Sequence, residues 1–400
     1  MYNLTGKNIV LGVTGSIAAY KAVDLASKLT QAGAIVDVLL TEDAARFVAP
    51  LSFAGVTGRP ADVDVFAAGD GSAEKHVELG RRADVLVIAP ATATTIARLA
   101  LGLAEDMVSL TALATRAPLV ICPAMDSLMY EHVSTQSNLQ LLQARGALIV
   151  GPEIGRLASG QAGPGRLSET SHIIGAVRYV LGQCSGDLLG RRIVVTAGGT
   201  QEPIDPVRYL GNYSSGRMGY ALAEAARDRG AEVALVSAPS HLEPPYGVKL
   251  VPVRRALEMR DSVLSECRGA DILIMAAAVA DYQPDRREQK IKREAAPLLL
   301  ELTPTPDILA ELKSQEGLVK VGFAAESRDL LENARSKLLA KGLDLIVAND
   351  ITKEGSGFGT ETNEVVLLDK DGGQVQLPLL SKYEVAQHIL DKIKTWLDRS

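Results

Sequence analysis

A buried strand, a glycine turn and a helix follow one another twice along the chain, and this repeat restricts the fold to the α/β class. The first copy runs from the apolar, β-branched residues 8–13 through Thr14-Gly15-Ser16 into helically spaced Ala, Val and Leu over residues 17–32. A further strand is predicted at 35–40. This βαβ unit directs the N–H groups of its first turn at any ligand above the helix.

The second copy opens at residues 192–197 and turns at Gly198-Gly199-Thr200. Before its helix, predicted at 218–229, it inserts the polar loop 201–217, which holds two prolines and a Ser-Ser-Gly-Arg run. Such composition is typical of a binding loop. Together with the basic cluster 290–293, this loop indicates a phosphate-rich ligand.

Both halves continue with apolar strands separated by helices that carry Ala and Leu faces, as in doubly wound parallel sheets. We therefore expect two tandem domains, and the turn-rich segment 182–190 predicts a tight join between domains 1–189 and 190–400. The further strands are predicted at 85–89, 119–122, 148–150, 232–236, 272–276, 318–323 and 345–348.

Charge and composition exclude several classes of protein. The 400 residues carry a net charge of −6, which argues against a nucleic-acid binder because such a protein needs a basic stripe. The longest uncharged apolar run, 272–280, is far too short for a membrane helix, and no export signal is visible. Three cysteines without a CxxC pair predict neither disulfides nor a zinc site. We expect a cytoplasmic protein.

Motifs in both halves are similar to those of known families. The first half resembles the homo-oligomeric flavin-containing cysteine decarboxylases, and the second half resembles phosphopantothenate–cysteine ligase. In this order, the two resemble the bifunctional coenzyme A biosynthesis family, which implies a flavoprotein-like and then a Rossmann-like doubly wound, mainly parallel three-layer domain. The motifs are GVTGSIAAYK, APATATTIARL, PAMDSLMY and GPGR in the first half, and VTAGGTQEPIDPVRYLGNYSSGRMG, AAAVADY, KIK, VGFAAE and DLIVAND in the second.

For the first half, the resemblance implies bound FMN and a decarboxylase that acts on 4'-phosphopantothenoylcysteine. It implies that His76 is the active-site base, a role that suits an imidazole pKa near the working pH. In this chemistry, oxidation of the thiol end creates an electron sink that makes loss of the carboxylate easy. The cofactor-binding residues that it implies are Gly15, Ser16, Thr41, Thr92, Thr94 and Ser109.

Two residues depart from the first family's pattern. Asp126 stands where an Asn commonly follows Pro-Ala-Met, and Ser159 stands where the glycine-rich flap commonly has a Cys. An ionised Asp would repel the substrate carboxylate, whereas a protonated Asp could still donate a hydrogen bond. A serine hydroxyl is also a far poorer proton donor than a thiol. Two hypotheses remain, an active decarboxylase that uses Asp126 and Ser159 or a flavin-binding half without turnover.

For the second half, the resemblance implies that CTP and Mg²⁺ activate 4'-phosphopantothenate as an acyl-cytidylate, which L-cysteine then displaces. Asn212 would contact this intermediate and Lys290 would assist its conversion. Arg217 replaces the family's more frequent Lys, and a guanidinium is not equivalent to an ammonium. The implied CTP-binding residues are Asp281, Lys290, Pro306, Asp307, Ile308, Leu309, Phe323, Lys337 and Lys341.

Other readings stay open at this stage. A two-domain NAD(P)-dependent oxidoreductase is one, although neither glycine turn completes G-x-G-x-x-G and Asp37 is the only candidate for a ribose-binding acid in the first unit. A non-enzymatic flavoprotein regulator would leave the ligase motifs unexplained. The resemblance also implies a homo-oligomer, with trimers of flavin halves and dimers of ligase halves building a dodecamer. The sequence assigns no metal ligands and does not decide between CTP and ATP.

Overall fold

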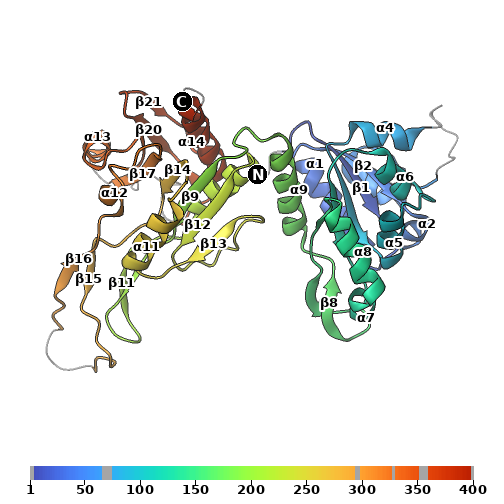
Figure 1. Ribbon diagram of the computed structural model, residues 1–400, viewed down its shortest axis with the longest axis horizontal. Coiled ribbons are helices and arrows are strands. Elements are labelled where there is room, and N and C mark those ends of the chain that lie inside the picture. The colour runs from blue at the N-terminus through green and yellow to red at the C-terminus, as the bar shows by residue number, and fades with distance from the viewer. Residues whose placement is uncertain (1–3, 65–73, 293–297, 327–328, 351–358, 398–400) are drawn as a thin grey trace. The chain divides into compact units, whose positions relative to one another are not determined.

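The computed structural model describes residues 4–64, 74–292, 298–326, 329–350 and 359–397, and Figure 1 shows its elements. The chain forms two compact units, Met1–Leu181 and Gly182–Ser400, and the division falls inside helix α9 (Thr170–Ser185). This division lies slightly before the join expected at 189/190, and the domain bounds 1–189 and 190–400 stay a prediction.

Unit 1 (Met1–Leu181) is built on a parallel sheet with the order β3-β2-β1-β4-β5-β6. Its central strand β4 is buried throughout and β1 is buried after Asn8, as expected for a sheet covered on both faces, and helices surround them in Figure 1. The order reverses between β1 and β4, and open α/β sheets bind ligands at such a point. The strands are β1 (Asn8–Val13), β2 (Ile35–Leu40), β3 (Ala61–Asp62), β4 (Val85–Ala91), β5 (Leu119–Pro123) and β6 (Leu148–Ile149).

The helices of unit 1 pack in pairs, α1 with α3, α4 with α6 and α5 with α8. Phe53 of α3 is completely buried. After β6, the chain forms an antiparallel hairpin of β7 (Glu153–Arg156) and β8 (Ala162–Arg166) at the position of the expected flap. The helices are α1 (Ala19–Gln31), α2 (Glu42–Phe47), α3 (Pro50–Thr57), α4 (Lys75–Arg82), α5 (Ala93–Leu101), α6 (Met107–Ala114), α7 (Ser127–Glu131) and α8 (Val133–Ala144).

Unit 2 (Gly182–Ser400) contains a larger sheet with the order β13-β12-β9-β14-β17-β18-β20-β21. Its strands are parallel up to β18, and β20 and β21 then add antiparallel at the edge, which the sequence analysis did not anticipate. The strands are β9 (Arg192–Ala197), β12 (Glu232–Ser237), β13 (Lys249–Pro252), β14 (Ile272–Met275), β17 (Val319–Glu326), β18 (Leu345–Asp350), β20 (Val365–Asp369) and β21 (Gln374–Gln376).

Alternate residues of β9 point into two separate apolar cores, which makes unit 2 a three-layer structure. Ile193 and Val195 pack in one core with α10 and α14, whereas Val194 packs in the other with α11 and α13. Trp396 of α14 packs against the first core. The α/β, doubly wound fold expected for the chain is thus confirmed. The helices are α10 (Arg217–Asp228), α11 (Ala256–Glu266), α12 (Ile308–Glu311), α13 (Leu330–Lys341) and α14 (Lys382–Leu397).

Three two-stranded sheets extend from unit 2, and the sequence analysis missed all of them. They are short, so their periodicity is too brief to read from sequence. The strand pairs are β10 (Gln201–Pro203) with β11 (Tyr209–Gly211), β15 (Tyr282–Pro284) with β16 (Leu302–Pro304), and β19 (Thr362–Asn363) with β22 (Leu380–Ser381).

None of the described helices is both long and apolar enough to cross a bilayer.

Candidate active sites

The unit 1 pocket has a volume of about 500 Å³ and lies where the chain leaves β1, β4 and β5. Because these strands are parallel neighbours, their carboxyl ends meet at one edge of the sheet. The hairpin β7–β8 supplies the remaining wall. The pocket brings together Gly15, Ser16, Thr92, Asp126 and Ser159, all predicted site residues, and its other lining residues are Ile17, Ala18, Tyr20, Lys21, Ala124, Met125, Met129, Arg156, Leu157, Ala158, Gly165, Arg166 and Leu167.

Thr14 fixes the glycine turn of this pocket, a role that the sequence analysis did not assign. Its buried hydroxyl donates to the carbonyl oxygen of Pro90 (2.7 Å) and accepts from the N–H of Thr92 (3.0 Å). The turns after β1 and β4 are thereby joined. Helix α1 follows with Ala18 as its N-cap, and the N–H groups of Ala18 and Ala19 donate to the hydroxyl (3.3 Å) and the carbonyl oxygen (2.9 Å) of Ser16. The positive end of the helix dipole at this turn favours an anion.

The two residues that depart from the family pattern touch each other in this pocket. The hydroxyl of Ser159 donates to Oδ2 of Asp126 at 2.7 Å, and the N–H of Leu128 donates to Oδ1 at 3.1 Å. The hydrogen bond from Ser159, followed by that from Leu128, holds the pKa of Asp126 below its usual value. Asp126 is therefore an ionised carboxylate at neutral pH, and the protonated form considered above is not favoured.

The hairpin approaches the β5 turn so closely that only glycine fits at one position of its second strand. A Cβ on Gly165, whose φ is +154°, would lie 2.1 Å from the carbonyl oxygen of Met125. Backbone hydrogen bonding confirms the approach, since the N–H of Met125 donates to the carbonyl oxygen of Gly165 at 3.0 Å. The GPGR motif therefore keeps Ser159 beside Asp126.

Four other predicted residues of the first half do not line this pocket. His76 lies half-buried in the first turn of α4. Thr41 is buried as the N-cap of α2, where its hydroxyl accepts from the N–H of Ala44 (3.2 Å). Thr94 is exposed on α5. Ser109 is nearly completely buried and bonds within the capping box of α6.

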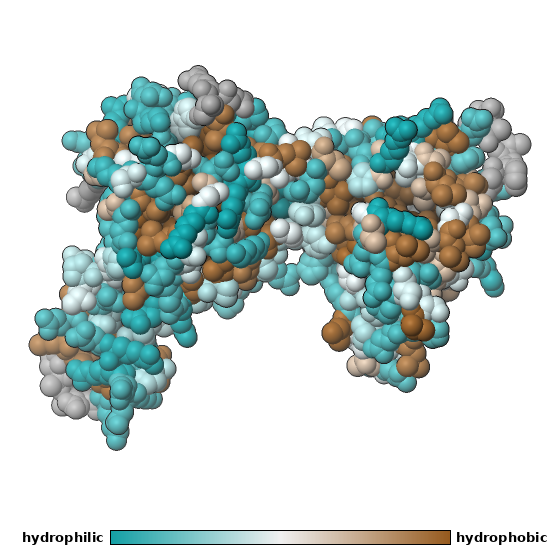
Figure 2. All heavy atoms as spheres, viewed as in Figure 1, coloured by the Kyte–Doolittle hydropathy of each residue, from teal (hydrophilic) through white to brown (hydrophobic). Residues whose placement is uncertain are grey.

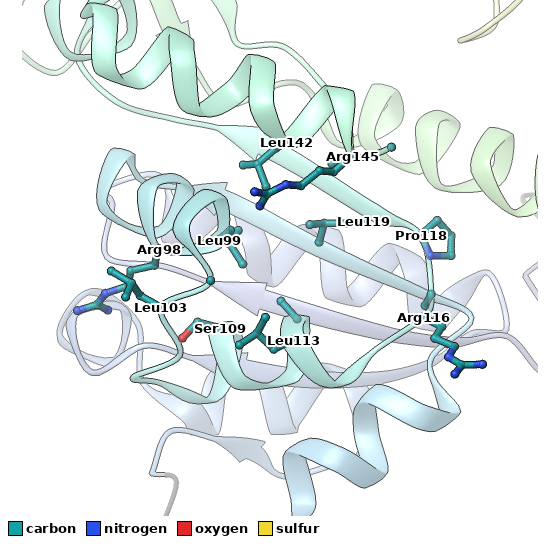
Figure 3. Close-up of a pocket in the computed structure, with 15 residues that line it drawn as sticks. Arg98, Leu99, Leu103, Ser109, Leu113, Arg116, Pro118, Leu119, Leu142 and Arg145 are labelled. Atoms are coloured by element: carbon teal, nitrogen blue, oxygen red, sulfur yellow. The ribbon is translucent and has the colours of Figure 1, made fainter.

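Ser109 instead lines a second cavity of unit 1, which we call the arginine pocket and which measures about 320 Å³. Figure 3 shows Arg98, Arg116 and Arg145 around an apolar floor that includes Leu119. Two of these guanidinium groups are engaged, Arg98 with Asp106 (2.8 Å) and Arg145 with the carbonyl oxygen of Ala100 (2.7 Å). Figure 2 shows apolar residues gathered over α5 and α6; the exposed leucines there are Leu101, Leu103 and Leu113.

The unit 2 pocket has a volume of about 520 Å³ and lies at the carboxyl ends of β14, β17 and β18. Four predicted site residues from four separate segments meet in it, namely Asn212, Asp281, Phe323 and Lys337. The other residues that line it are Tyr213, Ser214, Ser215, Gly216, Arg217, Met218, Gly219, Ala276, Ala277, Ala278, Val279, Ala324, Asn349, Asn363 and Lys382.

The loop after β14 donates hydrogen bonds to two buried threonines, one in β9 and one in the loop after it. Thr196 accepts from the N–H of Ala277 (3.0 Å), and Thr200 accepts from the N–H of Ala280 (2.9 Å). The side-chain amide of Asn212 adds a bond to the carbonyl oxygen of Val279 (3.3 Å). Asn212 is thus fixed at the pocket wall rather than being only a turn residue.

The two lysines spaced i,i+4 on α13 do different things. Lys337 donates to the carbonyl oxygen of Phe323 (2.8 Å) and lines the unit 2 pocket. Lys341 forms an ion pair with Asp307. Burial alone would raise the pKa of Asp307, but the ion pair and the N-capping of α12 together hold this pKa below its usual value. Lys341 lies outside the pocket lining.

Other predicted CTP-binding residues also lie outside that lining. Ile308 and Leu309 are buried in the apolar core on the α11 and α13 face, and Pro306 precedes them. Lys290 is exposed in the segment between β15 and β16. The neighbouring Ile291 donates its N–H to Asp205 (3.2 Å). Residue 293, the last of the predicted basic cluster, lies outside the described residues.

Sequence reasoning missed Asn349, Asn363 and Lys382, which line the unit 2 pocket from β18, β19 and α14. Nothing in the amphipathic pattern of α14 distinguishes its first lysine from the others. Arg217, the predicted departure from the family, lines the same pocket and pairs with Glu361. Among the described residues, no group of three or more His, Cys, Asp or Glu side chains could hold a metal ion.

Comparison with family models divides the chain as the structure does. Residues 1–182 match the Flavoprotein family, and residues 188–397 match the C-terminal domain of the DNA/pantothenate metabolism flavoproteins. The second match covers more than half of the chain.

Known proteins give the same assignment over nearly the full length. The chain is 45% identical over 394 residues to the coenzyme A biosynthesis bifunctional protein CoaBC of Bacillus subtilis, which covers 98% of this chain and 97% of that protein. Among solved structures, the C-terminal domain of a CoaBC protein is 42% identical, with a TM-score of 0.47, and covers 54% of this chain and all of that one. A PPC decarboxylase complexed with pantothenoylaminoethenethiol is 32% identical, with a TM-score of 0.39, and covers 43% of this chain and 96% of that one. The chain belongs to the CoaBC family of bifunctional coenzyme A biosynthesis proteins, with a flavoprotein decarboxylase domain followed by a ligase domain.

Proposed function

We propose that unit 2 joins 4'-phosphopantothenate to L-cysteine with CTP, through an acyl-cytidylate, and that unit 1 then decarboxylates 4'-phosphopantothenoylcysteine to 4'-phosphopantetheine with FMN. The observation that carries this proposal is the convergence of motifs that were predicted separately. Ser16, Thr92 and Asp126 line one pocket, and Asn212 and Lys337 line the other.

An amine cannot form an amide with a carboxylate unaided, because the leaving group would be oxide. The activated route needs positive charge and N–H donors. Transfer of the carboxylate to a nucleotide solves this problem but brings a triphosphate and a carboxylate into one pocket. Arg217 and Lys337 supply cations from α10 and α13. Helix α10 begins after Gly216 (φ +78°) without a side-chain cap, so its first N–H groups also favour phosphate.

Magnesium belongs to this proposal as a partner of the nucleotide. The described residues offer no cluster of acidic or histidine side chains for the ion. This fits the ordinary behaviour of Mg²⁺, which is often held by substrate phosphates and few protein groups. We therefore assign no protein ligand to it, and the roles of Arg217 and Lys337 do not depend on it.

The unit 1 pocket fits a flavin mononucleotide in size and in the character of its walls. Its volume of about 500 Å³ lies within the usual range for such ligands. Ser16 and the N-terminus of α1 would hold the phosphate, and Met125, Met129 and Leu157 offer an apolar wall for the ring. The bound flavin supplies the oxidation, and later the return of electrons, that makes the carboxylate leave. Asp126 holds Ser159 over the same space.

His76 would accept a proton during the oxidation, yet it does not line the unit 1 pocket. We therefore place its action in a site that a second copy of the chain completes. This placement agrees with the homo-oligomer that the resemblance implies. It predicts that a mixture of His76→Gln and Ser16→Asp chains regains part of the decarboxylase activity that each variant lacks alone.

One experiment tests both halves of the proposal. The full chain is mixed with 4'-phosphopantothenate, L-cysteine, Mg²⁺ and either CTP or ATP, and pyrophosphate and CO₂ are followed separately. We expect pyrophosphate first and CO₂ after it, with Asn212→Ala reducing pyrophosphate and His76→Gln reducing only CO₂. Pyrophosphate without CO₂ from the wild-type chain would refute the decarboxylase role of unit 1, and the absence of both products would refute the whole proposal.

A further inference from the structure

Lys382 is a deeply buried lysine on the wall of the unit 2 pocket. It is the first residue of α14, and only 7% of its surface is exposed. Its ammonium group donates to the carbonyl oxygens of Thr360 (2.7 Å) and Thr362 (3.1 Å). A lysine is almost never buried to this extent unless it is paired or functional.

Around Lys382 lie a second cation and the hydroxyl oxygen of Thr360, which also accepts from the ammonium group (3.3 Å). Arg217, at the start of α10, lies close enough to act on it, and the guanidinium group of Arg217 pairs with the exposed Glu361. Glu384, on the first turn of α14, accepts from the hydroxyl of Ser381 (2.6 Å). Burial first, and then the charge of Arg217, lower the pKa of Lys382 to about 8.

Two cations on neighbouring helix N-termini therefore border the same pocket as Gly216 and Lys337. Lys382 and Arg217 repel each other, and the burial of Lys382 strengthens this repulsion although Arg217 also pairs with Glu361. A polyanion between them would remove the repulsion and would favour the charged lysine.

We propose that Lys382 is a nucleotide-binding residue of the ligase, which with Arg217 holds the phosphate chain of the nucleoside triphosphate. This role rests on the proposed function and extends it to a residue that no motif singled out. It has a thermodynamic consequence, because an anion that favours the charged lysine must raise the protonated fraction when it binds. Nucleotide binding near pH 8 should therefore take up protons, and affinity should fall as the pH rises above 8.

The same chain provides a matched control. Lys320 of β17 is also buried, with 6% of its surface exposed, and its ammonium group donates to backbone carbonyl oxygens at the end of α12. It does not line the unit 2 pocket. The change Lys320→Met removes a buried, carbonyl-bound ammonium just as Lys382→Met does, so it reproduces the structural loss without the proposed contact to phosphate.

Titration calorimetry of the full chain with Mg²⁺-CTP tests the role without relying on turnover. Measurements at pH 8 in two buffers of different ionisation enthalpy give the number of protons exchanged. For the wild-type chain we expect a net uptake of protons on nucleotide binding, because an anion beside Lys382 raises the protonated fraction of the lysine. The wild-type measurement needs no variant and stands even where a variant folds poorly.

The variants separate charge from structure. Lys382→Met should bind Mg²⁺-CTP about tenfold more weakly at pH 7 and lose the proton uptake. Lys382→Arg should keep more of the affinity and also lose the uptake, because a guanidinium does not titrate in this range. Lys320→Met should behave as the wild-type chain. Binding of CTP with no uptake, or with unchanged affinity in Lys382→Met, would overturn the role of Lys382 alone. Failure of the wild-type chain to bind either CTP or ATP would overturn the proposed function together with it.

Discussion

Gly219 lets helix α10 lie directly on strand β9, and its replacement by alanine should damage the ligase selectively. A Cβ at this position would lie 2.6 Å from Cβ of Ala197 and 2.6 Å from the carbonyl oxygen of Thr196. Ordinary contacts begin at 3.4 Å, so the helix has to move by about 0.8 Å. Gly219 also lines the unit 2 pocket, and the displaced segment carries Arg217.

The expected loss of stability follows from two opposing effects. Alanine in place of glycine favours a helix by about 1 kcal/mol. Overpacking costs about 1–3 kcal/mol, and the upper value applies here because Gly219 would meet the main chain of a central strand. We expect a net loss of about 2 kcal/mol, which lowers the urea midpoint of unit 2 by at least about 0.7 M.

The single tryptophan of the chain makes this change measurable. Trp396 lies in α14 and packs on the core that α10 shares, so its fluorescence follows the unfolding of unit 2. We expect Gly219→Ala to lower that midpoint and to reduce pyrophosphate formation, while CO₂ release from added 4'-phosphopantothenoylcysteine continues. Ala221→Ser, a change at a half-buried position of the same helix, is the control. An unchanged midpoint together with unchanged pyrophosphate formation would refute the packing argument.

Three further predictions concern unit 1 and the cysteines. Because Asp126 is ionised and repels the substrate carboxylate, Asp126→Asn should lower the KM for 4'-phosphopantothenoylcysteine roughly threefold or more. The KM values of the wild-type chain and the variant should converge only as the pH falls through the lowered pKa of Asp126, below the usual 3.8. Equal KM values at pH 7 would contradict this repulsion. Phe53→Ala should cost about 3–5 kcal/mol of stability, seen in urea unfolding by circular dichroism, without moving the Trp396 fluorescence midpoint; a shift of that midpoint would show that the units do not unfold separately. In the native chain, only Cys184 should react rapidly with a thiol reagent, because burial raises the pKa of the other two cysteines; three fast equivalents would refute this.

Much of the fold could be predicted because the information is local. Strand β9 was predicted at its observed bounds, and α10 to within one residue, since buried parallel strands and amphipathic helices leave clear periodic patterns. The edge strands β20 and β21 and the three two-stranded sheets of unit 2 could not be predicted, because pairing at an edge depends on partners distant in sequence. The same distinction holds within α13, whose two lysines share a helix face although only Lys337 reaches the pocket.

The sequence by itself determined the class of each unit and the two glycine turns, and it supplied candidate residues of which some meet in each pocket, because strand periodicity and turn chemistry depend on neighbouring residues. Only the tertiary structure decided how those residues act. It placed the hydroxyl of Ser159 on Asp126, a contact that lowers the pKa of that carboxyl group. It also brought Lys382 to a pocket whose motifs lie up to 170 residues away, as Asn212 shows. Contacts of this kind depend on how strands and helices pack in three dimensions, and neither composition nor local spacing records that packing.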